Sequence, residues 1–225
     1  MSAAQARSVS IALGEGRVSG LLIAPPRARA AYVFAHGAGA GMTHPFMAAA
    51  AEGLAHRGIA ALRFQFPAME RGTRRVDPPA VAQEAVRAAV AEAARALPGV
   101  TLFAGGKSFG GRMTSQAQAQ APLPGVRGLA FLGFPLHPAG RPSARRAAHL
   151  ERIAIPMLFL QGSRDALASL DLLEPLVAKL GERATLAIFA EADHSFHVPA
   201  RTGQKDPEVL ARVLDALAAW IEANR

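Results

Sequence analysis

The sequence predicts an α/β fold: a mostly parallel sheet of about seven to eight strands with helices on both of its faces. Short apolar segments, typical of buried strands, alternate along the chain with longer segments of helical periodicity. Alternation of this kind builds β-α-β units, in which helices cover both sides of parallel strands. The first two apolar segments lie close together and predict a hairpin, which adds an antiparallel edge to the sheet.

The first part of the chain predicts this hairpin, two further strands and one helix. Residues 8–13 and 18–23 flank two glycines and form the hairpin. Residues 30–35 and 58–64 are apolar runs, so both predict buried strands. A helix is expected over residues 45–57, because a proline is tolerated in the first helical turn, where its missing N–H is no loss. A polar loop is expected after the second of these strands.

The middle of the chain predicts a long helix, a strand and another helix in close succession. Residues 80–97 contain no helix breaker, and Pro98-Gly99 ends the helix. Residues 100–104 then form an apolar strand. Residues 112–120 again lack a breaker and predict a helix, with a glycine-rich turn between the two.

The last part of the chain completes the alternating pattern. Residues 128–134, 156–160 and 184–189 predict three apolar strands. Helices are expected near residues 168–180 and over residues 207–221, the latter with apolar side chains at helical spacing. The connection after the first of these strands has about twenty residues, whereas a domain usually needs about 50, so no large cap domain is expected.

Length and composition indicate one globular domain spanning residues 1–225. Hydrophobic residues make up 51% and charged residues 19%, which is typical of a folded protein. The absence of cysteine excludes disulfides, thiolate metal sites and a cysteine nucleophile. No signal peptide or long apolar run is found, so we expect a soluble cytoplasmic protein without membrane contact.

The net charge of +8 raises the question of nucleic acid as a partner. The basic residues are scattered, apart from clusters at residues 71–75 and 141–146 in predicted loops. With one tyrosine and one tryptophan, a platform for stacking bases is not expected. We therefore predict no nucleic-acid partner, although a basic surface can attract anionic substrates.

The stretch AGGKSFGGR, residues 104–112, supports two incompatible interpretations. Its Gly-Lys-Ser resembles the end of a phosphate-binding P-loop, but that motif needs a glycine at the position held by Thr101. Gly-x-Ser-x-Gly is instead the pattern of a nucleophile elbow, a sharp strand-to-helix turn with small residues two positions before and after the serine. Gly106 and Gly110 meet this requirement, and a following Gly111 allows close helix packing. The sequence therefore favours Ser108 as a nucleophile.

A serine nucleophile needs a histidine base and a carboxylate that fixes the histidine tautomer. Asp165 directly follows the strand at 156–160, and His194 directly follows the strand at 184–189. Parallel sheets place their ligands at these strand ends, so we expect both side chains to approach Ser108. Alternatives left open are Glu191 or Asp193 as the acid and His197 as the base.

An oxyanion hole is expected from a glycine-rich loop and from the residue after the nucleophile. The loop at residues 36–41 supplies the Ala38 amide, with Gly39 as the weaker choice, and the elbow supplies the Phe109 amide. His44 and His137 are candidates for substrate binding, with a hydrogen-bonded loop role as the alternative for each.

Two further polar side chains near these motifs are expected to have structural roles. His36 is expected to tie loops together beneath the oxyanion hole. Lys107 is expected to point to solvent or to a loop carbonyl. The histidines lack the spacing of metal ligands, so no metal is predicted.

Taken together, HGAGAG after an early strand, GGKSFGGR, the Asp165 turn and Ala-Asp-His-Ser-Phe resemble the α/β-hydrolase superfamily. More narrowly they resemble its dienelactone-hydrolase-like group and a small testis-expressed and chromatin-complex-subunit branch. The chain departs from that pattern at Ala166-Leu167, where relatives often have Pro-Phe. The resemblance implies an α/β-hydrolase fold and an enzyme that cleaves esters, thioesters or lactones without a cofactor. Some members of the branch belong to assemblies, so a non-catalytic scaffold or ligand-binding protein remains the alternative.

Overall fold

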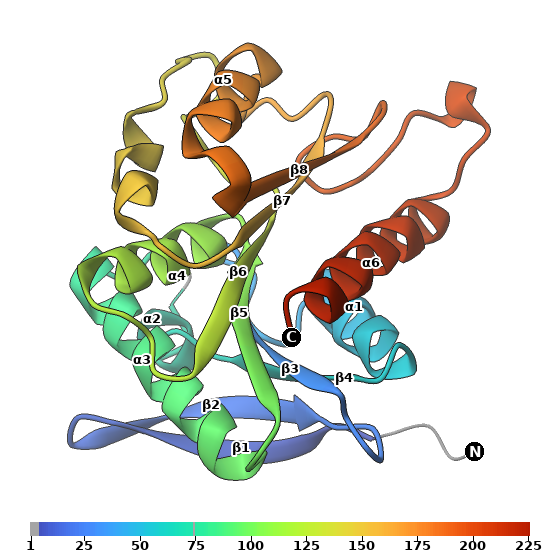
Figure 1. The fold of residues 1–225 in the computed structure, drawn as a ribbon. Coiled ribbons are helices and arrows are strands. Elements are labelled where there is room, and N and C mark those ends of the chain that lie inside the picture. Colours follow the sequence, from blue (N-terminus) through green and yellow to red (C-terminus); the bar gives the residue numbers. More distant parts are fainter. Residues whose placement is uncertain (1–4, 74) are drawn as a thin grey trace.

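A computed structural model describes residues 5–73 and 75–225, so Arg74 of the first basic cluster lies outside the described part. Within this part, eight strands form one sheet in the order β1-β2-β4-β3-β5-β6-β7-β8 (Figure 1). The strands are β1 (Arg7–Leu13), β2 (Gly16–Ile23), β3 (Ala30–Ala35), β4 (Ile59–Phe64), β5 (Thr101–Lys107), β6 (Val126–Leu132), β7 (Met157–Gly162) and β8 (Ala184–Phe189). The predicted α/β fold and its strand number are confirmed.

Pairing within the sheet follows the predicted mixture of directions. β1 pairs with β2, and β2 with β4, in antiparallel register. From β4 through β3 to β8 every pair is parallel. The carboxyl ends of β3, β5, β7 and β8 therefore point to the same edge of the sheet, where the predicted site residues lie.

Helices cover both faces of the sheet (Figure 1). α1 and α6 lie on one face, and α3, α4 and α5 lie on the other. The helices are α1 (Pro45–His56), α2 (Pro67–Glu70), α3 (Pro79–Ala96), α4 (Phe109–Gln120), α5 (Leu170–Leu180) and α6 (Asp206–Ala223), with short 3₁₀ segments η1 (Arg145–Arg152), η2 (Gly181–Arg183) and η3 (Ala200–Thr202). No described helix combines the length and apolar character needed to cross a membrane.

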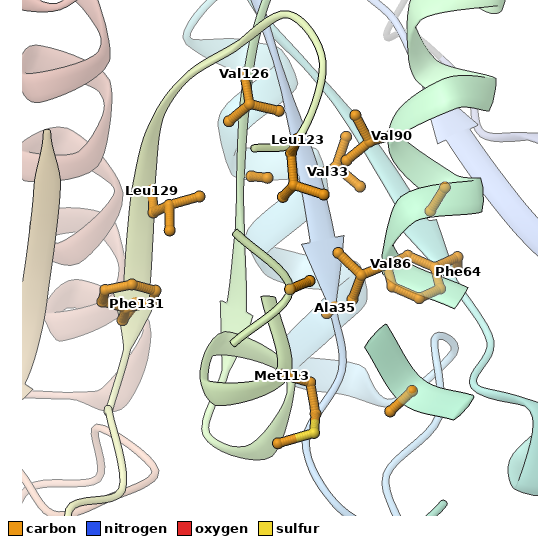
Figure 2. Close-up of a cluster of buried hydrophobic side chains, with 14 of the residues drawn as sticks. Val33, Ala35, Phe64, Val86, Val90, Met113, Leu123, Val126, Leu129 and Phe131 are labelled. Atoms are coloured by element: carbon orange, nitrogen blue, oxygen red, sulfur yellow. The ribbon is translucent and has the colours of Figure 1, made fainter. Parts of the chain in front are cut away.

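Two hydrophobic clusters hold the layers together because alternate residues of each strand face opposite sides. On β3, Val33 and Ala35 face α3 and α4, whereas Tyr32 and Phe34 face α1 and α6. Figure 2 shows part of the first cluster, with side chains from the strands meeting those of the covering helices. Burial on both faces explains why the central strands read as continuous apolar runs.

The boundaries differ from the prediction mainly around the elbow and in two connections. β5 continues to Lys107 and α4 begins at Phe109, so the turn between them is tighter than a loop extending to residue 112. The expected polar loop after β4 contains the one-turn helix α2, whose Ala68 amide donates to Asp77 Oδ2 at 2.8 Å. The connection after β6 contains η1, a short segment and not a cap domain.

Candidate active site

Ser108 occupies the single-residue turn between β5 and α4. Its backbone angles are φ 50° and ψ −116°, a region that residues with a side chain rarely adopt. Such strain persists only where the surroundings impose it, and it is common at functional sites. Because the chain is strand through Lys107, no loop exists that could surround a phosphate, and the P-loop interpretation is wrong.

Glycines surround Ser108 because the elbow packs tightly against neighbouring backbone. A Cβ at Gly106 or at Gly110 would lie 2.4 Å from the carbonyl oxygen of Ala35 on β3. A Cβ at Gly111 would lie 2.8 Å from the carbonyl oxygen of Gly106. Only glycine fits at these positions, which explains the Gly-x-Ser-x-Gly-Gly pattern as a packing requirement.

His194 lies between Ser108 and Asp165. Its Nε2 is 2.8 Å from Ser108 Oγ, and its Nδ1 is 2.6 Å from Asp165 Oδ2. A carboxylate can only accept, so this geometry assigns the imidazole proton to Nδ1 and leaves Nε2 free to accept the serine proton. The imidazole side chain is 23% exposed, whereas the Asp165 side chain has no exposed surface.

The Asp165 carboxylate is held in place by further donors. Its Oδ1 accepts from the Leu167 amide at 2.8 Å, and its Oδ2 also accepts from Gln161 Nε2. Gln161 is fully buried at the end of β7, and its side-chain oxygen accepts from the Phe134 amide at 3.0 Å. The departure from the family pattern at Ala166-Leu167 therefore leaves the carboxylate fully hydrogen-bonded.

The rival residues lie elsewhere in hydrogen-bond networks of their own. His197 contacts Asp206 at 2.8 Å on an exposed surface, and this carboxylate raises the pKa of His197. Glu191 pairs with Arg164 and Arg201, while Asp193 Oδ1 accepts from two backbone amides of its own turn. None of these three groups makes a described hydrogen bond to Ser108.

A cavity of about 370 Å³ opens beside Ser108. It is lined mainly by the loop after β3, the start of α1 and the loops after β7 and β8, through Gly37, Ala38, Ala40, His44, Phe46, Met47, Lys107, Ser108, Leu167, His194 and Ser195. Ala38 thus faces the same space as Ser108, and a Cβ at Gly37 would lie 3.9 Å from Ser108 Cβ. Phe109 is the first residue of α4, where helix amides have no acceptor within the helix.

The three remaining histidines of the prediction divide between the cavity and the surrounding loops. His44 lines the cavity and caps α1 by accepting from the Phe46 amide at 3.2 Å. His137 does not line it: the ring is buried, with Nδ1 against the Pro138 carbonyl and Nε2 accepting from the Ser169 amide. His36 is buried and accepts from the Phe66 amide, so it joins two loops as expected.

Lys107 takes one of the two arrangements expected for it. Its side chain is half-buried, and its ammonium donates to a loop carbonyl, that of His194. The nitrogen lies 5.8 Å from the ring centre of Phe46 and 5.5 Å from that of Phe196. Burial lowers the pKa of Lys107 to about 8, an effect that the negative charges of Asp165 and Asp193 partly oppose.

Gly133 lets Lys107 and His194 approach each other. A Cβ at this position would lie 2.9 Å from Lys107 Nζ and 3.3 Å from His194 Nδ1. The loop bearing His194 is thus held on one side by the ammonium and on the other by Asp165. Within residues 5–73 and 75–225, no group of three or more His, Asp or Glu side chains could hold a metal ion.

The sequence prediction missed two contributors to this site. Gln161 lies just after the strand predicted over residues 156–160 and was given no role, although a polar residue at the end of a buried strand is a signal for hydrogen bonding. Phe46 was read only as part of a helix, although it lines the cavity and stacks on Phe196 at 6.2 Å. The local sequence around Phe46 gives no sign of this contact, because Phe196 lies far away along the chain.

Comparison with known proteins gives the same architecture. The model of a family described as "Alpha/beta hydrolase domain" matches residues 28–222. A dienelactone hydrolase from Anabaena variabilis is 22% identical with a TM-score of 0.80, and 99% of each chain is covered. An α/β serine hydrolase without lid from Xanthomonas campestris is 20% identical with a TM-score of 0.72, covering 96% of this chain and 95% of that one. The esterase domain of a Rhodothermus marinus protein is 18% identical with a TM-score of 0.73, covering 96% and 97%. At these identities the similarity concerns the fold.

Proposed function

The chain belongs to the α/β hydrolase domain family, and we propose that it is a serine hydrolase of carboxylic esters, thioesters or lactones. The observation that carries this proposal is the continuous hydrogen-bonded chain from Ser108 Oγ through His194 to Asp165, with distances of 2.8 and 2.6 Å. A nucleophile, a base and an orienting carboxylate within hydrogen-bond reach are what acyl transfer by a serine requires.

In the acylation step, His194 Nε2 takes the proton of Ser108 while Oγ forms a bond to the acyl carbon. Asp165 holds the imidazole in the tautomer that can accept this proton and stabilises the imidazolium that results. The imidazolium then gives the proton to the leaving alcohol or thiol as the bond to the acyl carbon breaks. Water, activated by the same imidazole, attacks the acyl-enzyme and releases the acid, which restores Ser108.

Negative charge develops on the acyl oxygen in each tetrahedral intermediate. The amides of Ala38 and Phe109 are the proposed donors to this oxygen, and the first turn of α4 adds the positive end of its dipole. Removing one donor of this kind from a hydrolase typically costs about 3 kcal/mol of transition-state stabilisation.

The cavity supports small acyl substrates. Its volume is about 370 Å³, at the low end of the range of about 300–1,000 Å³ typical for small-molecule sites. Apolar side chains of Phe46, Met47 and Leu167 line it beside the polar loop atoms. A compact acyl group fits this lining, and no cofactor is needed for the reaction.

Labelling with a fluorophosphonate probe tests the proposal directly, because such probes react with an activated serine. We expect the wild-type protein to be labelled and the Ser108→Ala protein to be unlabelled. Ser195→Ala is the matched control, since Ser195 lines the same cavity and should leave labelling intact. Labelling that survives in Ser108→Ala would assign the reactive group to another residue, and labelling that is absent from the wild type would favour the scaffold alternative.

A further inference from the structure

A second hollow lies between α4 and η1 and shares no lining residue with the catalytic cavity. Its volume is about 550 Å³. We call it the arginine pocket, after the four arginines among its lining residues Arg112, Gln116, Arg145, Arg146, Ala148, His149 and Arg152. It lies between one side of α4 and η1, whose first two residues, Arg145 and Arg146, end the second basic cluster of the sequence.

Among the described residues, no acidic side chain pairs with the positive charges of this pocket. None of the ion pairs found within residues 5–73 and 75–225 involves its four arginines. α4 contains no acidic residue, and the one acid of η1, Glu151, pairs with Lys179 at 2.7 Å. The Nε atom of Arg112 is buried and has no hydrogen-bond partner within the described part of the chain.

The arginines also lie close enough to disturb one another. Burial lowers the pKa of Arg112, and the charge of Arg146 lowers it further. Repulsion of this kind is relieved when an anion binds between the cations, because each guanidinium then gains a partner of opposite charge.

A hydrogen bond fixes the ring of His149, one of the lining residues of the pocket. Its Nε2 lies 2.7 Å from Ser115 Oγ, which joins η1 to α4. Burial, followed by the charges of Arg112 and Arg152, lowers the pKa of His149 to about 4, so the ring is neutral near pH 7. The arginines of η1 therefore lie on a segment that is hydrogen-bonded to α4, the helix that follows Ser108.

We propose that the arginine pocket binds the phosphate groups of a small phosphorylated molecule. Planar guanidinium groups bind phosphate oxygens in pairs, and four of them around one hollow suit a diphosphate better than a single carboxylate. The absence of Phe, Tyr and Trp from the lining residues favours a small ligand over a nucleic-acid strand, which would need stacking platforms.

The position of Arg112 suggests two sources for the phosphate. Its amide donates to the Ser108 carbonyl at 3.1 Å, so the pocket begins one helical turn from the proposed nucleophile. The phosphate can be a distant part of the hydrolysed substrate, or it can belong to a separate ligand that binds beside the active site.

Titration calorimetry with inorganic pyrophosphate tests the site itself. We expect saturable binding to the wild-type protein that weakens by at least about tenfold in Arg145→Gln/Arg152→Gln, since two charge-assisted contacts are lost. Both side chains are exposed, so these substitutions are compatible with folding, which a thermal melt confirms. The control is Arg7→Gln/Arg127→Gln, which removes the same charge from exposed strand positions and should bind as the wild type does.

Kinetics then distinguish the two sources. If the substrate carries the phosphate, the pocket variant should raise KM for acetyl coenzyme A but not for S-acetylpantetheine, which lacks the diphosphate. If the ligand is separate, both thioesters should be hydrolysed as by the wild type while pyrophosphate binding is lost. The calorimetry does not depend on hydrolysis, so it stands even if neither thioester is cleaved.

Two results would overturn the proposal. One is the absence of saturable pyrophosphate binding to the wild-type protein. The other is an equal loss of affinity in the pocket variant and in the control variant, which would indicate diffuse attraction to a basic surface.

Discussion

Replacing Lys107 by methionine should make the protein more stable at pH 7, and the gain should shrink as the pH rises. The side chain of methionine fills a similar space between Phe46 and Phe196 without a charge. In the folded protein, burial lowers the pKa of Lys107 from 10.5 to about 8. At pH 7 the folded protein therefore carries a largely buried ammonium, which Lys107→Met removes.

The size of the effect follows from linkage. A shift from 10.5 to about 8 corresponds to about 3 kcal/mol between the two protonation states. Between these values the unfolded chain binds the proton and the folded protein does not, so the stability of the wild type rises with pH in this window. From pH 7 to pH 9 the free energy of unfolding of the wild type should rise by about 1 kcal/mol, and that of the variant should not show this rise.

Urea unfolding of both proteins at pH 7, 8 and 9 measures this difference. The excess stability of Lys107→Met should decrease by about 1 kcal/mol over that range. Lys179→Met is the matched control, because Lys179 is exposed on α5 and its difference from the wild type should stay constant. If the difference in free energy of unfolding between Lys107→Met and the wild type is the same at all three pH values, the lowered pKa of Lys107 is refuted.

The remaining predictions concern the elbow and the acid–base pair. Gly106→Ala should destabilise the fold by about 3 kcal/mol in urea unfolding, because its Cβ would lie 2.4 Å from the Ala35 carbonyl oxygen, whereas Gly16→Ala meets its nearest atom at 3.7 Å and should be nearly neutral. Asp165→Asn should lower kcat for p-nitrophenyl acetate by about 10⁴-fold, because the amide favours the wrong tautomer of the proposed base. His197→Ala should retain activity towards the same ester, since its ring pairs with an exposed carboxylate, and a loss comparable to that of Asp165→Asn would make His197 the base.

The strands were predictable because their signal is local. Residues 30–35 form a strand with the expected bounds, since burial on both faces of a parallel sheet demands a continuous apolar run. Residues 184–189 also form a strand with the expected bounds, although β8 lies at the edge of the sheet and is partly exposed. Short segments carry a weaker signal. α2 and η1 are too short to show a helical periodicity in the sequence. Both are stabilised by contacts to distant residues, α2 by the Asp77 carboxylate and η1 by the Ser115 hydroxyl.

The three residues of the candidate site could also be predicted from the sequence, because a serine nucleophile needs partners of only a few residue types. A serine elbow requires a histidine and a carboxylate after later strands, and the structure brings Ser108, His194 and Asp165 into hydrogen-bond contact. What the sequence does not contain is the direction of each side chain. For His137 the sequence left open a substrate-binding role and a hydrogen-bonded loop role, and the structure shows the latter, with both ring nitrogens bonded to loop backbone.

The elbow explains why neighbours in sequence end in different sites. The reversal of the chain at Ser108 separates Lys107, the last residue of β5, from the first turn of α4. Lys107 and Ser108 therefore both line the cavity beside the elbow, where the Lys107 ammonium donates to the His194 carbonyl, whereas Arg112 lines the arginine pocket. Two cations thus lie near the proposed nucleophile in different surroundings. Lys107 is half-buried near the rings of Phe46 and Phe196, and Arg112 faces a hollow with no acidic lining residue. Because the Lys107 ammonium already donates to the His194 carbonyl, whereas no ion pair is found for Arg112 among the described residues, substitutions in the arginine pocket should affect phosphate binding, and Lys107→Met should affect stability and its pH dependence.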